Sequence, residues 1–315
     1  MWLLLKYTLL YAAVLILVAL GGMFSERSGV INIALEGIMV IGGLMGVVMI
    51  NIMNAAGAPL FLGILVTILV AALAGMIYSS LLAFSAINLK ADQTIGGTAL
   101  NLLATAVAMV IAKRINGSDS PKITYSTNTN AVFNSSHFSF NVGPLTLNWF
   151  LLVTVAAVAA AWFILYRSRF GMRLMACGEH PQAADSVGIN VYKMRWAGVL
   201  MSGALGGIGG MAYIVPAVGD WNFEMGVAGM GFLALAVMIF GQWKPLNIAG
   251  AALFFAVFRA MANIFDSIPF LAGLGWPKEI YNMMPFIASM IVLAFTSKKS
   301  RAPKAEGIPY DKGSR

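Results

Sequence analysis

The chain has 315 residues, of which 60% are hydrophobic and only 10% are charged, and its mean hydropathy is +0.84. A soluble domain carries about 25% charged residues, so this composition excludes an ordinary soluble enzyme. The net charge of +8 would point to nucleic acid in a soluble protein. Here the basic residues lie between and after the apolar runs, where they act as orientation signals instead.

The apolar runs predict an all-α integral membrane protein, a polytopic bundle of transmembrane helices. A bilayer core about 30 Å thick requires roughly 20 apolar residues in a helix, and about nine runs (eight to ten) fit that requirement. The seventh run is short and flanked by glycines, so we expect it to be tilted, broken or partly re-entrant. In chain order, the expected spans are Trp2–Gly22, Val30–Met53, Leu60–Ala86, Thr94–Ala112, Trp149–Tyr166, Trp196–Pro216, Val227–Gly241, Ile248–Phe265 and Ile280–Phe295.

Two basic segments predict the orientation of the bundle. The connection 167–195 and the tail 298–315 both contain more basic than acidic residues, and loops of this kind remain in the cytoplasm. Four expected spans separate them, and because this number is even, both segments can lie on the cytoplasmic side. We expect a single transmembrane domain, 1–297, followed by the basic tail. The N-terminus then lies outside, although Lys6 in the first span argues mildly against that. The polar connection 114–148 also lies outside, and we expect a folded surface loop with a short hairpin.

Small residues gather in three of the expected spans. They let helix backbones approach closely in a membrane, so we expect a tightly packed bundle. Plain packing explains any single glycine, whereas so many in one helix also permit sliding or bending, and both interpretations stay open. The residues are Gly203, Gly206, Gly207, Gly209 and Gly210 in the sixth span, Gly37, Gly42, Gly43 and Gly46 in the second, and Ala71, Ala72, Ala74 and Gly75 in the third.

Polar residues at membrane depth are candidates for function, because an ionisable group in hydrocarbon costs at least ~2.5–3.5 kcal/mol on insertion scales. Glu36 lies about one turn into the second span, with Asn32 one turn earlier on the same expected helix face. Asn101 lies in the fourth span near Thr98. For Glu36 two interpretations are balanced. It is either an interfacial carboxylate paired with Arg27, or a group that faces a solute path or holds the broken entry of the second helix.

A second polar group lies in the eighth span. Arg259 and Asn263 are spaced i, i+4, and Asp266 ends the span, so the carboxylate can pair with either of them through a turn of helix. A structural link between Arg259 and a neighbouring helix is the favoured interpretation.

No motif for catalysis or nucleotide hydrolysis occurs in the sequence. It has no G-x-x-x-x-G-K-[ST] loop, no H-E-x-x-H and no G-x-S-x-G. His137 and His180 offer no metal-ligand spacing, and the single cysteine, Cys177, allows no internal disulfide. We therefore expect no cofactor and no ATPase site of its own, so that energy for any active transport comes from another subunit.

The connection between the fifth and sixth expected spans predicts a short amphipathic helix along the membrane. Pro181 suits the first position of a helix, and Gly188 and Asn190 suit its end. The residues expected to form its small apolar face are Ala183, Ala184 and Val187.

Four stretches that span almost the whole chain carry a family resemblance. They are Glu26–Gly37, Lys90–Asn101, Gly178–Lys193, and Gly231–Ala236 with Gly241–Pro245. Together they resemble the permease subunits of ATP-binding-cassette (ABC) importers of the branched-chain amino acid, ribose and nucleoside group. Within that group the chain is most similar to the smaller of two permeases in nucleoside uptake systems linked to a basic membrane lipoprotein.

The resemblance implies a multi-pass subunit of a bacterial inner-membrane importer, with a cytoplasmic C-terminus, driven by a separate ABC ATPase. A second related permease would complete a heterodimeric core, and an extracellular substrate-binding lipoprotein would deliver the substrate. Asn32, Glu36, Thr98 and Asn101 would lie near a nucleoside path. The short helix would be the coupling helix, with Glu179 and Asp185 meeting basic groups of the ATPase. Its expected ATPase-coupling residues are Gly178, Glu179, Pro181, Ala184, Asp185, Gly188, Ile189 and Asn190.

Three alternatives remain open from the sequence. A permease of the same class could import a simple sugar or a branched-chain amino acid, because the external receptor largely selects the substrate. A stand-alone secondary transporter or channel would require inverted repeats and midplane ion sites, which are not evident. A membrane enzyme would require a nucleophile and base pair, and none is recognisable.

Overall fold

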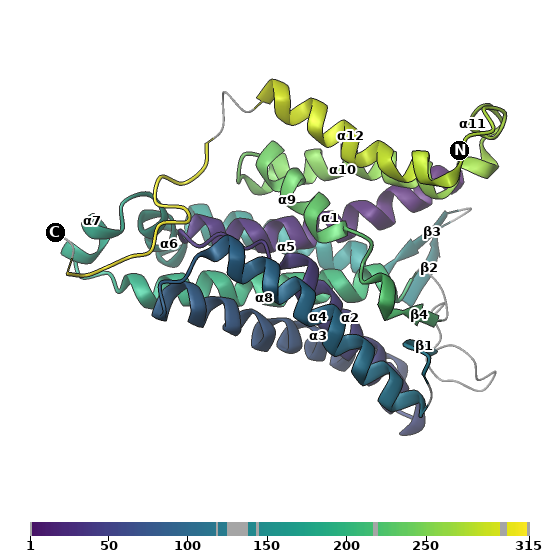
Figure 1. Ribbon diagram of the computed structural model, residues 1–315, viewed down its shortest axis with the longest axis horizontal. Helices are drawn as coiled ribbons and strands as arrows, with labels where there is room; N and C mark the ends of the chain where they lie inside the picture. Colours follow the sequence, from purple (N-terminus) through teal and green to yellow (C-terminus); the bar gives the residue numbers. More distant parts are fainter. Residues whose placement is uncertain are drawn as a thin grey trace.

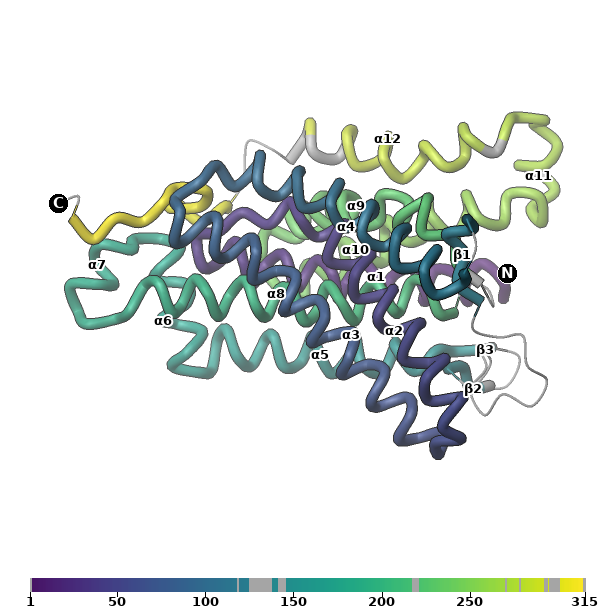
Figure 2. Tube along the Cα trace, turned by 60° about the horizontal axis from the view of Figure 1, so that its bottom comes forward, coloured from purple at the N-terminus to yellow at the C-terminus, as the bar shows by residue number. Residues whose placement is uncertain are grey.

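Long helices run side by side in an elongated bundle in the computed structural model (Figure 1). The structure describes residues 2–117, 119–124, 138–142, 145–216, 220–296 and 301–313. The start of α1 (Trp2–Arg27) lies at one end of the bundle with the short strands. The helices α6 (Arg169–Glu179) and α7 (Pro181–Ser186) and the C-terminal segment lie at the other end (Figures 1 and 2).

Eight helices in the described part of the chain are long and apolar enough to cross a membrane, which confirms the all-α polytopic class. They are α1, α2 (Leu35–Ala55), α3 (Leu60–Ala83) with the π-helical η1 (Phe84–Asn88), α4 (Gln93–Asn116), α5 (Trp149–Arg167), α8 (Val191–Ile214), the 3-10 helix η3 (Phe223–Met225) with α9 (Met230–Phe240), and α10 (Pro245–Asn263). The ninth expected span is α12 (Lys278–Thr296), which follows η4 (Phe265–Ser267) and α11 (Pro269–Ala272) and lies outside that set of eight.

The helix α8 lies at the centre of the packing, against α1, α2 and α3. A Cβ atom added at Gly75 of α3 would overlap the carbonyl of Gly203 on α8 and lie 3.0 Å from the Cα of Gly207. A Cβ atom added at Gly42 of α2 would lie even closer to the Cα of Gly207. Lipid tails do not drive helices together, so close backbone contact of this kind stabilises the bundle instead. The structure thus has the tight packing expected from these glycines.

One of the expected spans starts late and another is interrupted. The chain between α1 and α2 is not helical over residues 28–34, so the second helix begins at Leu35 and not at Val30. The seventh span is broken, as expected, because η3 and the turn 226–229 precede α9, whose N-cap residue Gly229 has a φ of 75°. Non-helical backbone at membrane depth must find hydrogen-bond partners within the protein.

Short antiparallel strands lie at the N-terminal end of the bundle. In the long polar connection, β2 (Ser139–Val142) and β3 (Leu145–Asn148) pair as the expected hairpin. The strand β1 (Lys122–Thr124) pairs with β4 (Asp220–Asn222) and so ties the connection after α4 to the one after α8, which the sequence did not predict. Residues 118, 125–137 and 143–144 of that connection, and residues 297–300 and 314–315 around the basic tail, lie outside the described residues.

Candidate functional site

Side chains of α4 hold the non-helical segment that precedes α2. The backbone N–H of Ile31 donates to Oε1 of Gln93 at 2.7 Å. Nδ2 of Asn101 donates to the carbonyl of Ile33 at 2.9 Å, and its Oδ1 accepts from the N–H of Gly37 at 2.8 Å. Asn101 is only 8% exposed, so both ends of its amide are used to close the start of α2.

Asn32 is fully buried in the same segment and contacts α8. Its Nδ2 donates to Oγ of Ser202 at 2.7 Å, while its Oδ1 has no hydrogen-bond partner among the described residues. The expectation that Asn32 and Glu36 share one helix face is wrong. The helix starts only at Leu35, because the N–H of Ile31 and the carbonyl of Ile33 bond to side chains of α4 instead of continuing a helix.

Glu36 closes the second break in the bundle. Its Oε1 accepts from the N–H of Gly229 at 2.9 Å, and its Oε2 accepts from the N–H of Gly231 at 2.7 Å. These amides lie at the start of α9, where a helix leaves N–H groups unsatisfied and favours a negative charge. Arg27, the other partner considered, lies 3.8 Å from Glu179 instead. Glu36 therefore holds a broken helix entry, that of α9 rather than that of its own helix.

The remaining residue of the expected path, Thr98, lies outside this network. Its side chain is exposed, and its hydroxyl donates to the carbonyl of Thr94 one turn earlier at 2.8 Å. Gln93 and Ser202 belong to the network, and sequence reasoning missed both. For Gln93 a signal was present, because it lies within one of the family-like stretches, whereas Ser202 carries none.

Arg259 of α10 contacts three neighbouring helices. Its Nη2 donates to Oη of Tyr213 on α8 at 3.2 Å, and its Nη1 lies 3.5 Å from Oδ1 of Asn282 on α12. Its guanidinium also lies 5.7 Å from the ring centroid of Tyr11 on α1, within the range of a cation–π interaction. This arrangement agrees with the favoured interpretation of Arg259 as a structural link.

The helices α6 and α7 form the connection expected to couple to an ATPase. Pro181 is the first residue of α7, and Gly188, with a φ of 82°, follows its end, as expected. The predicted apolar face is wrong in part. Ala184 is buried, whereas Ala183 is exposed and Val187 is 75% exposed. The cause is that α7 has only six residues and buries two of them, Pro181 and Ala184, of which Ala184 packs against α6 and α8.

Other residues of this connection anchor it to its surroundings. Asn190 caps α8 rather than ending α7, because its Oδ1 accepts from the backbone N–H three residues later at 2.9 Å. The N–H of Ile189 donates to the carbonyl of Ala184 at 3.0 Å. Gly178 packs so closely on the carbonyl of Arg27 that a Cβ atom would overlap it.

Both carboxylates expected to meet the ATPase have basic neighbours within the chain. Glu179 lies 3.8 Å from Arg27, and Asp185 lies 3.8 Å from Lys312. Partly exposed pairs at this distance contribute little stability, so they leave both carboxylates free to exchange partners. Lys312 belongs to the C-terminal segment, for which the sequence predicts only a basic tail.

The sequence matches the family described as "Branched-chain amino acid transport system / permease component" over residues 4–294. It is 39% identical to the guanosine ABC transporter permease protein NupQ of Bacillus subtilis, over 98% of this chain and 96% of that protein. It is also 39% identical to the nucleoside ABC transporter permease protein NupC of Lactococcus lactis, over 96% of this chain and 95% of that protein. A second permease of that organism, NupB, is 27% identical over 58% of this chain and 50% of its own length.

Proposed function

The chain belongs to the branched-chain amino acid transport system permease family, and we propose that it is the membrane-spanning permease subunit of an ATP-driven importer of nucleosides. Members of this family are permease subunits of ABC importers and are not enzymes themselves, and the apolar helices make this chain a multi-pass membrane protein. In the proposal, the chain supplies half of the translocation path and receives mechanical work from a separate ATPase.

The observation that carries the substrate class is similarity over nearly the whole length to NupQ and NupC, whose names specify guanosine and nucleosides. A nucleoside presents hydroxyls and base edges, which neutral donors and acceptors recognise better than charges do. The alternative is an importer of a simple sugar or a branched-chain amino acid, and the uptake experiment described below distinguishes it from a nucleoside importer.

The proposed partners are an ABC ATPase on the cytoplasmic side, an extracellular substrate-binding lipoprotein and a second, related permease. Similarity to both NupB and NupC of one organism supports a core built from two different permeases. The coupling helix would be α7, with the exposed Val187 at its end available to a groove of the ATPase. The C-terminus would lie in the cytoplasm of a bacterial cell, beneath its inner membrane.

The polar residues around the helix breaks would act as positioning residues. Asn32, Glu36 and Asn101 bind backbone groups or a neighbouring helix and thereby set the entries of α2 and α9. Discontinuous helices border the substrate sites of many transporter folds, because their free backbone groups can face a cavity. Thr98, whose side chain is exposed, is the member of the predicted set that is free to contact a substrate.

Uptake of labelled guanosine by cells with and without the gene tests this proposal. Loss of the gene should abolish uptake, and the complete set of subunits should restore it, because the permease provides the path. Labelled leucine and ribose serve as controls for the alternative. Loss of leucine or ribose uptake, with guanosine uptake intact, would contradict the nucleoside assignment and leave the family assignment in place.

A further inference from the structure

The C-terminal segment 301–313 folds back onto the coupling connection instead of leaving the bundle (Figures 1 and 2). The N–H of Ala305 donates to the carbonyl of Gly178 on α6 at 2.8 Å. Two residues later, the N–H of Gly307 donates to the carbonyl of Gly29 in the break between α1 and α2 at 3.2 Å. One short segment therefore contacts both the coupling connection and the non-helical stretch 28–34 before α2, which side-chain amides such as that of Asn101 hold.

A buried arginine forms the next anchor of this segment. Arg195 of α8 is 1% exposed, and its Nη1 donates to the carbonyl of Ile308 at 2.9 Å. Its Nε and Nη2 have no hydrogen-bond partner among the described residues. A buried cation is costly unless it is paired or hydrogen-bonded, so this carbonyl of the segment matters to α8.

Tyr310 is the centre of the contact with the coupling helix. It is 4% exposed and packs in one cluster with Cys177 of α6, Ala184 of α7 and Val191 of α8. Its ring centroid lies 5.3 Å from that of Tyr192, with the rings edge to face. Ala184 is the one buried residue of the apolar face expected for α7, and Tyr310 packs against it. A helix of six residues has little stability of its own, so such contacts determine where α7 lies.

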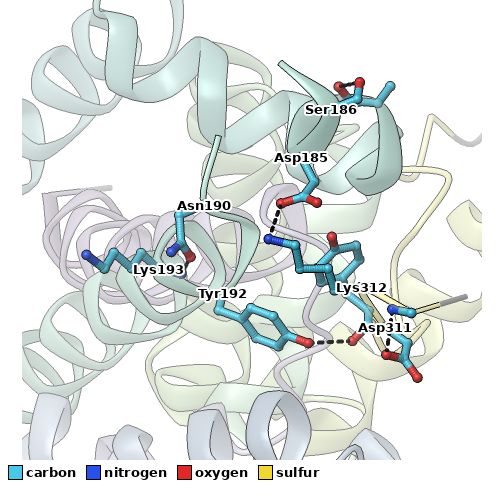
Figure 3. A network of polar contacts seen from close by, with 10 residues as sticks. Asp185, Ser186, Asn190, Tyr192, Lys193, Asp311 and Lys312 are labelled. Carbon is cyan, nitrogen blue, oxygen red and sulfur yellow. Dashed lines mark hydrogen bonds and ion pairs between the residues drawn. The ribbon is translucent and has the colours of Figure 1, made fainter. Parts of the chain in front are cut away.

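Two charged residues, Asp311 and Lys312, follow Tyr310 in the segment, and Figure 3 shows Lys312 reaching toward Asp185. Lys312 lies 3.8 Å from Asp185 of α7. Nζ of Lys90, in the connection that leads into α4, lies 2.9 Å from Oδ2 of Asp311. This hydrogen bond lowers the pKa of Asp311 and raises the pKa of Lys90. The segment thus also contacts the connection that leads into α4, the helix that carries Asn101.

We propose that segment 301–313 is a strap that positions the coupling helix and links its movement to the start of α2 and to α4, with Tyr310 as the key positioning residue. This inference rests on the proposed function, because it assumes that α7 receives the movement of an ATPase. The strap lies beyond residue 294, where the family match ends. Its contacts on both the coupling connection and the helix breaks provide a mechanical route between them.

The test measures the number of guanosine molecules transported per ATP hydrolysed by the complete transporter in lipid vesicles. Tyr310→Ala removes the ring, so the ratio should fall about fivefold or more, the size of a typical coupling between sites. The ATPase subunit should still co-purify. Tyr310→Phe keeps the ring and removes only the hydroxyl, which interacts with Asp185, so it is the matched variant and its ratio should fall less than that of Tyr310→Ala.

A second pair of variants tests the link to α4 without touching the ring. Asp311→Lys should lower the ratio, and Asp311→Lys combined with Lys90→Asp should restore it, because the exchange rebuilds the ion pair.

A merely structural role of the segment would lower uptake and hydrolysis in proportion and leave the ratio unchanged. This result would overturn the proposal that the segment is a strap. Failure of the exchanged pair to restore the ratio would overturn it as well. A wild-type complex that takes up no guanosine would contradict the proposed function itself, whereas normal wild-type coupling with unaffected variants would contradict the strap alone.

Discussion

At the scale of single residues, polar side chains inside the bundle bind backbone groups. The amide of Asn101 uses its nitrogen as a donor and its oxygen as an acceptor, both to the backbone around the start of α2. Glu36 offers two acceptors, and both receive N–H groups at the start of α9. No water is available in a membrane core to satisfy such groups. These side chains therefore make the helix breaks possible.

Replacing Asn101 with leucine should destabilise the protein. The change leaves the N–H of Gly37 and the carbonyl of Ile33 without their partner, and each buried unsatisfied group costs about 1–3 kcal/mol. The thermal unfolding midpoint in detergent should fall accordingly. Thr98→Val on the same helix is the control, because its hydroxyl bonds to a carbonyl of α4 itself. Equal midpoints for Asn101→Leu and Thr98→Val would show that the amide does not support the break.

At the scale of elements, the contact between α3 and α8 depends on the absence of side chains. Gly75 and Gly203 face each other so closely that a Cβ on either would meet backbone or a serine side chain of the other helix. Backbone atoms cannot rotate away as side chains do, so a methyl group here must separate the two helices.

Gly75→Ala should therefore lower the thermal unfolding midpoint, by an amount equivalent to about 1–3 kcal/mol for overpacking. Gly250→Ala on α10 is the matched control, because no atom of another described element lies within 4 Å of its added Cβ. Alanine is favoured over glycine in a helix by roughly 0.5–1 kcal/mol, so this control should be neutral or stabilising. A larger loss from Gly250→Ala than from Gly75→Ala would contradict the assigned packing.

The sequence predicts the spans well and their interruptions poorly, for one physical reason. Span length depends on local hydropathy, so α5 begins at Trp149 as expected. The start of α2 depends on hydrogen bonds from α4, which no local pattern reveals. The strap is a further example, because its amides bond to Gly178 and Gly29, more than a hundred residues away in the sequence. In the candidate site, the sequence predicts that polar residues such as Asn101 and Glu36 matter, but it does not predict the groups to which they bond.

At the scale of the whole molecule, the two basic segments lie at one end of the bundle and the N-terminus lies at the other (Figure 1). Loops rich in lysine and arginine stay in the cytoplasm. The end that carries α6, α7 and the strap should therefore face the cytosol, where an ATPase would reach α7. The strands β1 to β4 would then face the outside, where a receptor would dock.

Labelling of single cysteines tests this orientation. Ser120→Cys and Ser186→Cys place a thiol at exposed positions near opposite ends of the bundle. A membrane-impermeant maleimide should label Ser120→Cys in intact cells and Ser186→Cys only in inverted membrane vesicles.

The native Cys177 should react slowly, because it is buried and burial raises the pKa of its thiol to about 11, which leaves little reactive thiolate. Cys177→Ser gives the background. Labelling of Ser186→Cys in intact cells would place α7 on the outer face, where no ATPase could engage it, and would remove the basis of both the proposed function and the strap.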